Sequence, residues 1–163
     1  MMLDALPIDP SNSATIQIER FGAITAELQA LFSDMWSDMS RDQSLPPMEV
    51  DYDNYVRLEG LGVLRTFTVR WQGELVGAMV FFVAPNMHHR SSLWATCDVV
   101  WIRPDMRKPM VGMRLVRYAE ITFEHDGVNV LRMGTKIKHP ALGRLLEYLG
   151  WTPVEVSWQK VLS

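Results

Sequence analysis

The sequence predicts a mixed α/β domain, in which about four helices flank a central, mostly antiparallel sheet of about six strands. Two strand-like runs surround the tight turn Gln72-Gly73, which indicates a hairpin. The run over residues 93–102 is almost continuously apolar, as in a buried central strand. A helical pattern over residues 109–126 separates this strand from later strand-like runs, so at least one crossover connection is implied.

The first part of the chain contains one predicted strand and two predicted helices. Residues 15–20 alternate in the way of a half-buried strand, and residues 24–39 place apolar side chains at helical spacing. A polar, proline-containing loop over residues 40–50 follows. Asp51 is a suitable N-cap for a short helix that ends near Leu61.

The hairpin strands span residues 63–71 and 74–83. We expect a loop over residues 84–90 to connect the hairpin to the buried strand at 93–102. The long helix over residues 109–126 comes next and is followed by a glycine, a residue that often terminates helices.

Three further elements complete the predicted domain: a strand over residues 128–137, a helix over 140–149 and a last strand over 152–162. Residues 1–13 hold prolines and small polar side chains without periodicity, so we expect a flexible lead-in there. The length of 163 residues then predicts a single domain over residues 14–163.

Composition argues against several classes of protein. Apolar residues make up 48% of the chain and charged residues 21%, and no apolar run is long enough for a membrane helix. The N-terminus lacks the features of a secretory signal and Cys97 is the lone cysteine, so we expect a cytoplasmic protein with a buried structural thiol and no internal disulfide. The net charge of −3 argues against nonspecific binding to nucleic acids.

The junction between the buried strand and the long helix is the most informative segment. A short basic turn opens the helix there, so unpaired backbone N–H groups and the positive helix end meet Arg107 and Lys108. Anions bind at such points. Gly112, one turn into the helix, leaves room for a phosphate or a neighbouring strand. We therefore expect this junction to bind a small polyanion.

The run Arg107-Lys-Pro-Met-Val-Gly112 resembles the pyrophosphate motif of the GNAT superfamily of acyl-CoA-dependent N-acyltransferases, Arg/Gln-x-x-Gly-x-Gly/Ala after the fourth strand. Met110 stands at the first glycine position, and Pro109 removes one backbone donor. The run Leu145-Leu-Glu-Tyr-Leu-Gly-Trp151 resembles a second family segment, and the order of elements matches the family. Residues 139–147 are similar to a branch often encoded by bacteriophages, which implies a host bacterial cytoplasm.

The resemblance implies acetyl-CoA as the cofactor and places it at this junction. The amides of Val99 and Val100 would polarise the thioester carbonyl. The positions that the resemblance assigns to cofactor binding are Val99, Val100, Ile102, Arg107, Lys108, Met110, Val111 and Gly112.

Two residues are the candidates for proton transfer. Asp98 is the candidate general base, because the family commonly uses an acidic residue on the fourth strand; the alternative is that it faces solvent or accepts backbone hydrogen bonds. The family's usual acid, a tyrosine, aligns with Leu146, and Tyr148 lies about 200° further around a helix. His139 is the substitute acid; the alternative is a histidine that caps a helix or fills a loop.

The predicted acceptor site involves five aromatic or imidazole side chains. Trp36, Tyr52 and Tyr55 belong to the helix-loop-helix region that forms the acceptor wall in the family; the alternative is that they are core aromatics. His88 and His89 would contact the acceptor or remain loop residues. Adjacent histidines point in different directions and no other ligand has metal-site spacing, so we expect no metal.

The sequence thus predicts an N-acyltransferase that moves an acetyl group from acetyl-CoA to a small-molecule or peptide amine by direct attack. Two alternatives stay open. A GNAT-like CoA-binding or protein-interaction module with little or no turnover is favoured by Pro109, Met110 and Leu146. A nucleic-acid-modifying acyltransferase would need a basic patch beside the cleft. The identity of the acceptor and the formation of a homodimer are left open.

Overall fold

The computed structural model describes residues 14–39 and 45–162, so the predicted lead-in over residues 1–13 lies outside the described residues. These described residues form eleven elements, of which η1 and η2 are short 3₁₀ helices. In order they are β1 (Ala14–Ile18), η1 (Phe21–Ala23), α1 (Thr25–Met39), α2 (Tyr52–Gly60), β2 (Leu64–Trp71), β3 (Glu74–Asn86), β4 (His89–Ile102), η2 (Pro104–Met106), α3 (Pro109–His125), β5 (Val130–Arg132) and α4 (Ala141–Tyr148).

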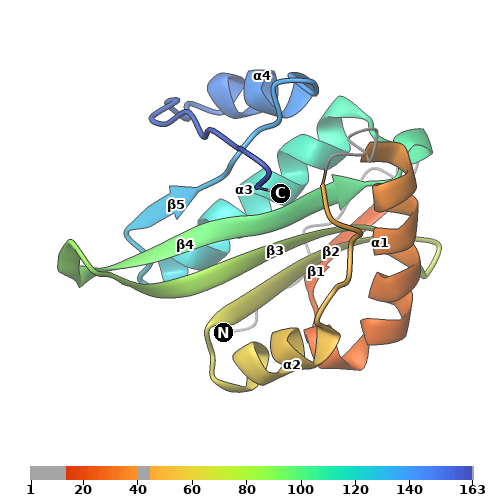
Figure 1. Cartoon of the computed structure of the whole chain (residues 1–163), viewed down its shortest axis with the longest axis horizontal. Coiled ribbons are helices and arrows are strands. Elements are labelled where there is room, and N and C mark those ends of the chain that lie inside the picture. The colour runs from red at the N-terminus through yellow and green to blue at the C-terminus, as the bar shows by residue number, and fades with distance from the viewer. Residues whose placement is uncertain (1–13, 40–44, 163) are drawn as a thin grey trace.

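The strands form one sheet in the order β1-β2-β3-β4-β5 (Figure 1). The first four strands pair antiparallel with their neighbours, and β5 runs parallel to β4. The antiparallel strands follow one another through short connections, whereas the parallel pair requires the crossover through α3. This arrangement confirms the predicted mixed α/β class, with five strands in the described residues and four α-helices.

The connection between β3 and β4 corrects the predicted loop over residues 84–90. β3 continues to Asn86 and β4 already begins at His89, so only Met87 and His88 form the turn. The two strands therefore make a long hairpin that projects beyond the rest of the sheet (Figure 1). Ladder hydrogen bonds satisfy backbone groups that a loop would have left to water.

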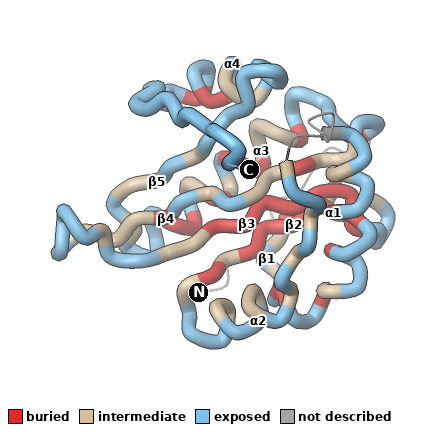
Figure 2. Tube along the Cα trace, viewed as in Figure 1, coloured by how far each residue is buried: buried red, intermediate tan, exposed pale blue. Residues whose placement is uncertain are grey.

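The predicted last strand over residues 152–162 is not formed. Val154, Val156 and Trp158 alternate with polar residues, yet they are 71%, 69% and 94% exposed. The segment that leads to the C-terminus is accordingly coloured as exposed in Figure 2. β5 is also shorter than the predicted strand over residues 128–137, since only three residues pair with β4. An alternating pattern becomes a strand only where a partner strand pairs with it and buries one face.

Helices cover both faces of the sheet (Figure 1). α3 packs on one face, and α1 and α2 pack on the other, while α4 lies against α3. The core on the α3 face includes Phe67, Val69, Met79, Phe81, Val111, Leu115 and Phe123. The core on the α1 and α2 face includes Phe21, Leu28, Leu31, Phe32, Val80 and Trp101. Among the described residues, no helix is both long and apolar enough to cross a bilayer.

An ion cluster around Arg70 ties the start of the chain to β2. Its Nε lies 2.8 Å from Glu19 Oε2, and its Nη1 lies 2.8 Å from Glu27 Oε2 on α1. Burial alone would raise the pKa of Glu19, but hydrogen bonds from Arg70 and Thr68 outweigh it and lower that pKa to about 2. The charged form of Glu19 is therefore part of the folded structure.

Candidate functional site

The sheet opens along β4, the element that carries more of the predicted site residues than any other. β4 pairs with β5 only from Trp94 to Thr96, and from Cys97 onward its β5 side has no ladder partner among the described strands. Backbone groups alternate between the two sides of an antiparallel strand. Arg103 donates its N–H to Val76 of β3, 2.8 Å away, which places the amides of Val100 and Ile102 on the open side.

The same alternation separates the two amides that were predicted to polarise a carbonyl. Val99 pairs with Val80 in the register of the Arg103 bond, so its N–H faces β3 and is used within the sheet. Val100 is the member of the pair whose amide faces the open edge. The sequence alone does not distinguish these two amides, because it does not fix which of two consecutive residues bonds to which neighbouring strand.

Asp98 lies at a β-bulge on the open part of β4. Val80 pairs with Val99 and Phe81 with Cys97, so Asp98 is an extra residue without a partner on β3. A bulge bends its strand and changes the direction of the side chain. The Asp98 carboxylate is exposed, and its Oδ2 accepts a hydrogen bond from the Tyr55 hydroxyl on α2. Asp98 therefore points toward the face that α1 and α2 cover, and it is not fully solvated there.

Cys97, the neighbour of Asp98, points the opposite way. Its side chain packs against the core on the α3 face. Burial, followed by the charge of Asp98, raises the pKa of the Cys97 thiol to about 12. This agrees with the predicted structural thiol and argues against a nucleophile.

The first turn of α3 leaves one backbone donor for a ligand. Pro109 has no N–H, and the amides of Val111 and Gly112 both donate to the Lys108 carbonyl, at 3.0 and 3.4 Å. The amide of Met110 is thus the one in this turn without an intrahelical acceptor. The Met110 side chain is 51% exposed and the Lys108 side chain is exposed, so neither lies in the packed core.

Gly112 serves the contact between α3 and α4. A Cβ at this position would lie 3.2 Å from Leu145 Cδ2, closer than side-chain carbons usually approach. The sequence suggested a phosphate or a strand as the neighbour, and the structure shows a helix. The absence of a side chain at Gly112 lets Leu145 of α4 pack against the first turns of α3.

Arg107 is engaged in contacts on the α1 side of the turn. Its Nη2 lies 2.6 Å from Asp38 Oδ2, and its Nε donates to the Ile102 carbonyl at 2.6 Å. The guanidinium also lies over the Trp101 ring, 5.4 Å from its centroid. Hydrogen bonds from Arg107 and then Trp101 lower the pKa of Asp38, and the charge of His139 adds a smaller effect. Asp38 is a site neighbour that sequence analysis missed, because it lies 69 residues from Arg107 and no local pattern links them.

The predicted acceptor aromatics divide between core and site. Tyr52 packs against Phe32, and Tyr55 stacks on Phe21, with ring centroids 6.4 and 4.8 Å apart. Both tyrosines border the core on this face, as the core alternative proposed, and Tyr55 also reaches Asp98. Trp36 lies half-buried on α1, the helix that carries Asp38.

His88 and His89 lie at the far end of β4. They are exposed at the tip of the β3–β4 hairpin, and His89 stacks on Trp94 with centroids 5.6 Å apart. Nine residues of strand separate His89 from Asp98, which is roughly 30 Å at about 3.3 Å per residue. The structure therefore does not bring these histidines near Asp98. Within residues 14–39 and 45–162, no three His, Cys, Asp or Glu side chains gather closely enough to hold a metal ion.

α4 places Leu146 and Tyr148 on different sides of the helix, as the helical spacing predicted. Leu146 is 6% exposed and packs against α3, whereas Tyr148 is 79% exposed and faces away. His139 precedes α4 and is exposed, and Pro140 occupies the N-cap position instead. His139 therefore does not cap this helix, which removes one alternative for its role.

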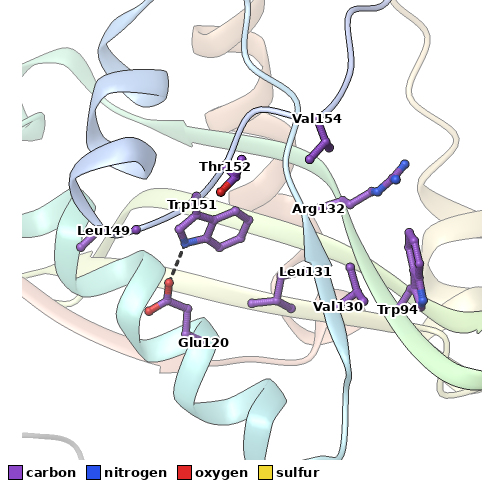
Figure 3. Close-up of a pocket in the computed structure, with 10 residues that line it drawn as sticks. Trp94, Glu120, Val130, Leu131, Arg132, Leu149, Trp151, Thr152 and Val154 are labelled. Atoms are coloured by element: carbon purple, nitrogen blue, oxygen red, sulfur yellow. Dashed lines mark hydrogen bonds between the residues drawn. The ribbon is translucent and has the colours of Figure 1, made fainter.

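A separate hollow of about 410 Å³ lies beside β5 (Figure 3). The Trp151 indole points into it and donates to Glu120 Oε1 at 2.6 Å. The lining residues are Trp94, Glu120, Val130, Leu131, Arg132, Leu149, Gly150, Trp151, Thr152 and Val154. None of the predicted site residues is among them.

Comparison with known proteins places the chain in a family. A model of the acetyltransferase (GNAT) family matches residues 28–151. The chain belongs to the GNAT family. The expected class, an N-acetyltransferase, is confirmed at the level of the family. No curated protein matches this GNAT-family chain.

Solved structures share the fold of this GNAT protein. An aminoglycoside acetyltransferase from an uncultured soil metagenomic sample, in complex with sisomicin, has a TM-score of 0.73 at 10% identity and covers 95% of this chain and 100% of its own. A ribosomal-protein-alanine N-acetyltransferase from Brucella melitensis has a TM-score of 0.70 at 14% identity, with coverage of 93% and 100%. Glucosamine-6-phosphate N-acetyltransferase from Arabidopsis thaliana has a TM-score of 0.68 at 9% identity, with coverage of 93% and 99%. At these identities the likeness concerns the fold alone.

Proposed function

We propose that the protein is an N-acetyltransferase that binds acetyl-CoA along the open edge of β4 and acetylates an amine held beside Asp98. The observation that carries the proposal is the end of β4–β5 pairing at Thr96, two residues before the bulge. The end of this pairing leaves backbone donors at the edge of β4 available to a ligand. The Asp98 carboxylate points away from that edge, toward the face that α1 and α2 cover. One strand thus separates a cofactor side from an acceptor side.

The residues present fit acetyl-CoA. The Met110 amide and the Lys108 side chain would hold the diphosphate at the N-terminus of α3, where helix ends favour anions. Arg107 would join them after exchanging its bond to Asp38 for one to phosphate. The open amides of Val100 and Ile102 would bind the rest of the cofactor and polarise its carbonyl.

Acetyl-CoA supplies an acetyl thioester, whose carbonyl carbon an amine attacks directly, so that a C–N bond forms while the C–S bond breaks. Asp98 accepts the proton that the amine gives up. His139 is the proposed donor of a proton to the sulfur, since the usual position for this role is the buried Leu146. Positioning of the amine between Asp98 and the open edge supplies the remaining rate enhancement.

A CoA-binding module without turnover is the second candidate. The burial of Leu146 against α3 and the loss of a donor at Pro109 favour it, because each removes a group that would assist the reaction. The similarity of residues 139–147 to bacteriophage-encoded proteins supports a phage origin and a host bacterial cytoplasm for either candidate.

Calorimetric titration with acetyl-CoA, combined with turnover assays, tests the proposal. The acceptor amines are an aminoglycoside, a peptide with N-terminal alanine and glucosamine 6-phosphate, the chemistries named for the solved neighbours. Saturable binding and an acetylated product by intact mass are expected. Binding without product from any amine favours the module, and no binding at millimolar acetyl-CoA rejects both candidates.

Replacing the carboxylate tests the proposed base. Asp98→Asn should lower kcat about 100-fold and leave the Kd for acetyl-CoA unchanged, because a general base acts on the amine. Asp34→Asn on α1 is the control, since it removes the same charge from an exposed site. Turnover by Asp98→Asn at the wild-type rate over the whole pH profile would refute the role of Asp98.

Replacing Arg107 tests the diphosphate site. Arg107→Ala should weaken acetyl-CoA binding by about 1–2 kcal/mol, less than a fully available guanidinium would contribute, because the bond to Asp38 competes with phosphate. Arg103→Ala is the matched control: it removes an arginine near the same turn, whose partners are Asp105 and Glu74. Equal effects of both changes would mean that only net charge matters.

A further inference from the structure

We infer that Tyr55 is a positioning residue, which holds the Asp98 carboxylate in place for the amine through its hydroxyl. This inference rests on the proposed function, in which Asp98 is the base. The observation that carries it is the bond from the Tyr55 hydroxyl to Asp98 Oδ2, across 43 residues of sequence. A bulge residue without a ladder partner has a less constrained backbone than its neighbours, so an external contact has to fix its side chain.

The helix that carries Tyr55 is anchored at both ends. Asp51 accepts the Asn54 amide at 3.0 Å as an N-cap. Near the other end, Glu59 accepts the amides of Phe21 and Gly22, the latter at 3.0 Å. α2 has no fully buried residue, so these polar contacts and the aromatic face determine where it lies.

The Tyr55 ring is held between two aromatic neighbours. It stacks on Phe21 with an interplanar angle of 7° and on Phe82 of β3 with centroids 6.1 Å apart. Stacked rings leave the phenol little freedom to turn, and its hydroxyl end is directed at the bulge. The ring thus connects a fixed helix to the one carboxylate proposed as base.

The Tyr55 hydroxyl is suited to donate a hydrogen bond to Asp98 and not to take part in proton transfer. Burial, together with the hydrogen bond to Asp98, raises the pKa of the Tyr55 phenol above its ordinary value, so it stays protonated at neutral pH. Its single O–H occupies Oδ2, which leaves Oδ1 as the oxygen that accepts the amine proton. The same hydrogen bond favours one rotamer of Asp98, so the carboxylate spends less time in rotamers that point away from the amine.

The experiment compares two tyrosine-to-phenylalanine changes. Tyr55→Phe removes the hydroxyl that bonds Asp98. Tyr118→Phe is the control, because it removes a hydroxyl from a half-buried tyrosine of α3 that packs edge-on against Phe67, on the opposite face of the sheet. Release of the CoA thiol from acetyl-CoA is measured with each of the three amines named above. We expect Tyr55→Phe to lower kcat about 10- to 100-fold with the KM for both substrates and the Kd for acetyl-CoA unchanged, and Tyr118→Phe to stay near wild type.

The double variant with Asp98→Asn separates positioning from other roles. If Tyr55 acts through Asp98, adding Tyr55→Phe to Asp98→Asn causes no further loss of kcat. An equal loss in both backgrounds, or a rise in the KM for the amine alone, would overturn the inference and leave Tyr55 as a wall of the acceptor site. Thermal unfolding of each variant shows whether a loss of activity reflects misfolding; Tyr55→Phe that unfolds with wild-type stability yet loses kcat supports the inference.

The results that would reject the proposed function differ from those that would reject only the role of Tyr55. Wild-type protein that binds acetyl-CoA but releases no CoA with any amine would reject the base role of Asp98 and the inference with it. Wild-type turnover that Tyr55→Phe leaves unchanged would reject only the inference.

Discussion

The two ends of the sheet are held together in different ways. β1 to β4 pair in antiparallel ladders of at least five residues, with aromatic side chains of β2 and β3 fully buried under α3. β5 joins through three residues, and residues 152–162 are all exposed. The proposed site lies where these two regions meet, on the strand that belongs to the ladder on one side and is open on the other. The pairing that stabilises the sheet lies on the β3 side of β4, and the proposed site lies on its opposite, open side.

Core truncations in the two regions should differ in cost. Phe67 is fully buried and contacts Phe81, Tyr118 and Phe123 edge-on, whereas Leu146 of α4 contacts a small cluster. Phe67→Ala should lower the free energy of unfolding by about 3–5 kcal/mol and Leu146→Ala by about 2–3 kcal/mol, because the smaller cluster relaxes more easily. Urea unfolding measures both. A larger loss for Leu146→Ala would mean that the C-terminal region carries as much of the stability as the ladder.

Acid should weaken the ladder region through Glu19. Its folded pKa of about 2 lies below the ordinary value of 4.5, so its contribution is present above about pH 4.5 and is lost as the pH falls toward 2. At about 1.4 kcal/mol per pKa unit, the full contribution at neutral pH is roughly 3–4 kcal/mol. Glu19→Gln should be less stable at pH 7 and should lose correspondingly less stability between pH 5 and 2. Glu124→Gln, at an exposed position of α3, is the control and should follow the wild-type pH dependence.

Deleting residues 152–163 should have the smallest effect. The described part of this segment is exposed, and the ion pair between Arg132 and Glu155, at 3.1 Å, is also exposed. Because surface ion pairs contribute little, we expect the unfolding free energy to change by less than about 0.5 kcal/mol in a urea titration. A loss of several kcal/mol would instead support a sixth strand, as the alternation of the sequence predicts.

Local patterns account for most of the fold. The N-cap at Asp51, the turn at Gln72-Gly73 and the helical stripe of α3 all depend on neighbours within a few residues, and all were predicted correctly. The strand predicted over residues 152–162 was wrong. A strand forms only where a partner strand is available, and an alternating sequence does not show whether one is. β3 and β4 also extend into the predicted loop over residues 84–90, because their residues there pair with each other.

The sequence suggests a location for the proposed site but not the contacts of its side chains. The basic turn and the glycine pointed to the start of α3, and the resemblance pointed to Asp98. The bonds from Tyr55 to Asp98 and from Arg107 to Asp38 span 43 and 69 residues, so no spacing rule could reveal them. The bulge at Asp98 depends on the register between two strands, which the sequence of either strand alone does not determine.

The chemistry of Cys97 has a practical consequence. Burial raises the pKa of the Cys97 thiol far above neutral, so the thiolate, the form that reacts with thiol reagents, is scarce at pH 7. The folded protein should therefore give almost no background with a disulfide dye, even at high enzyme concentration. Colour development in such an assay would report liberated coenzyme alone, which makes slow acetyl transfer measurable without labelled substrates.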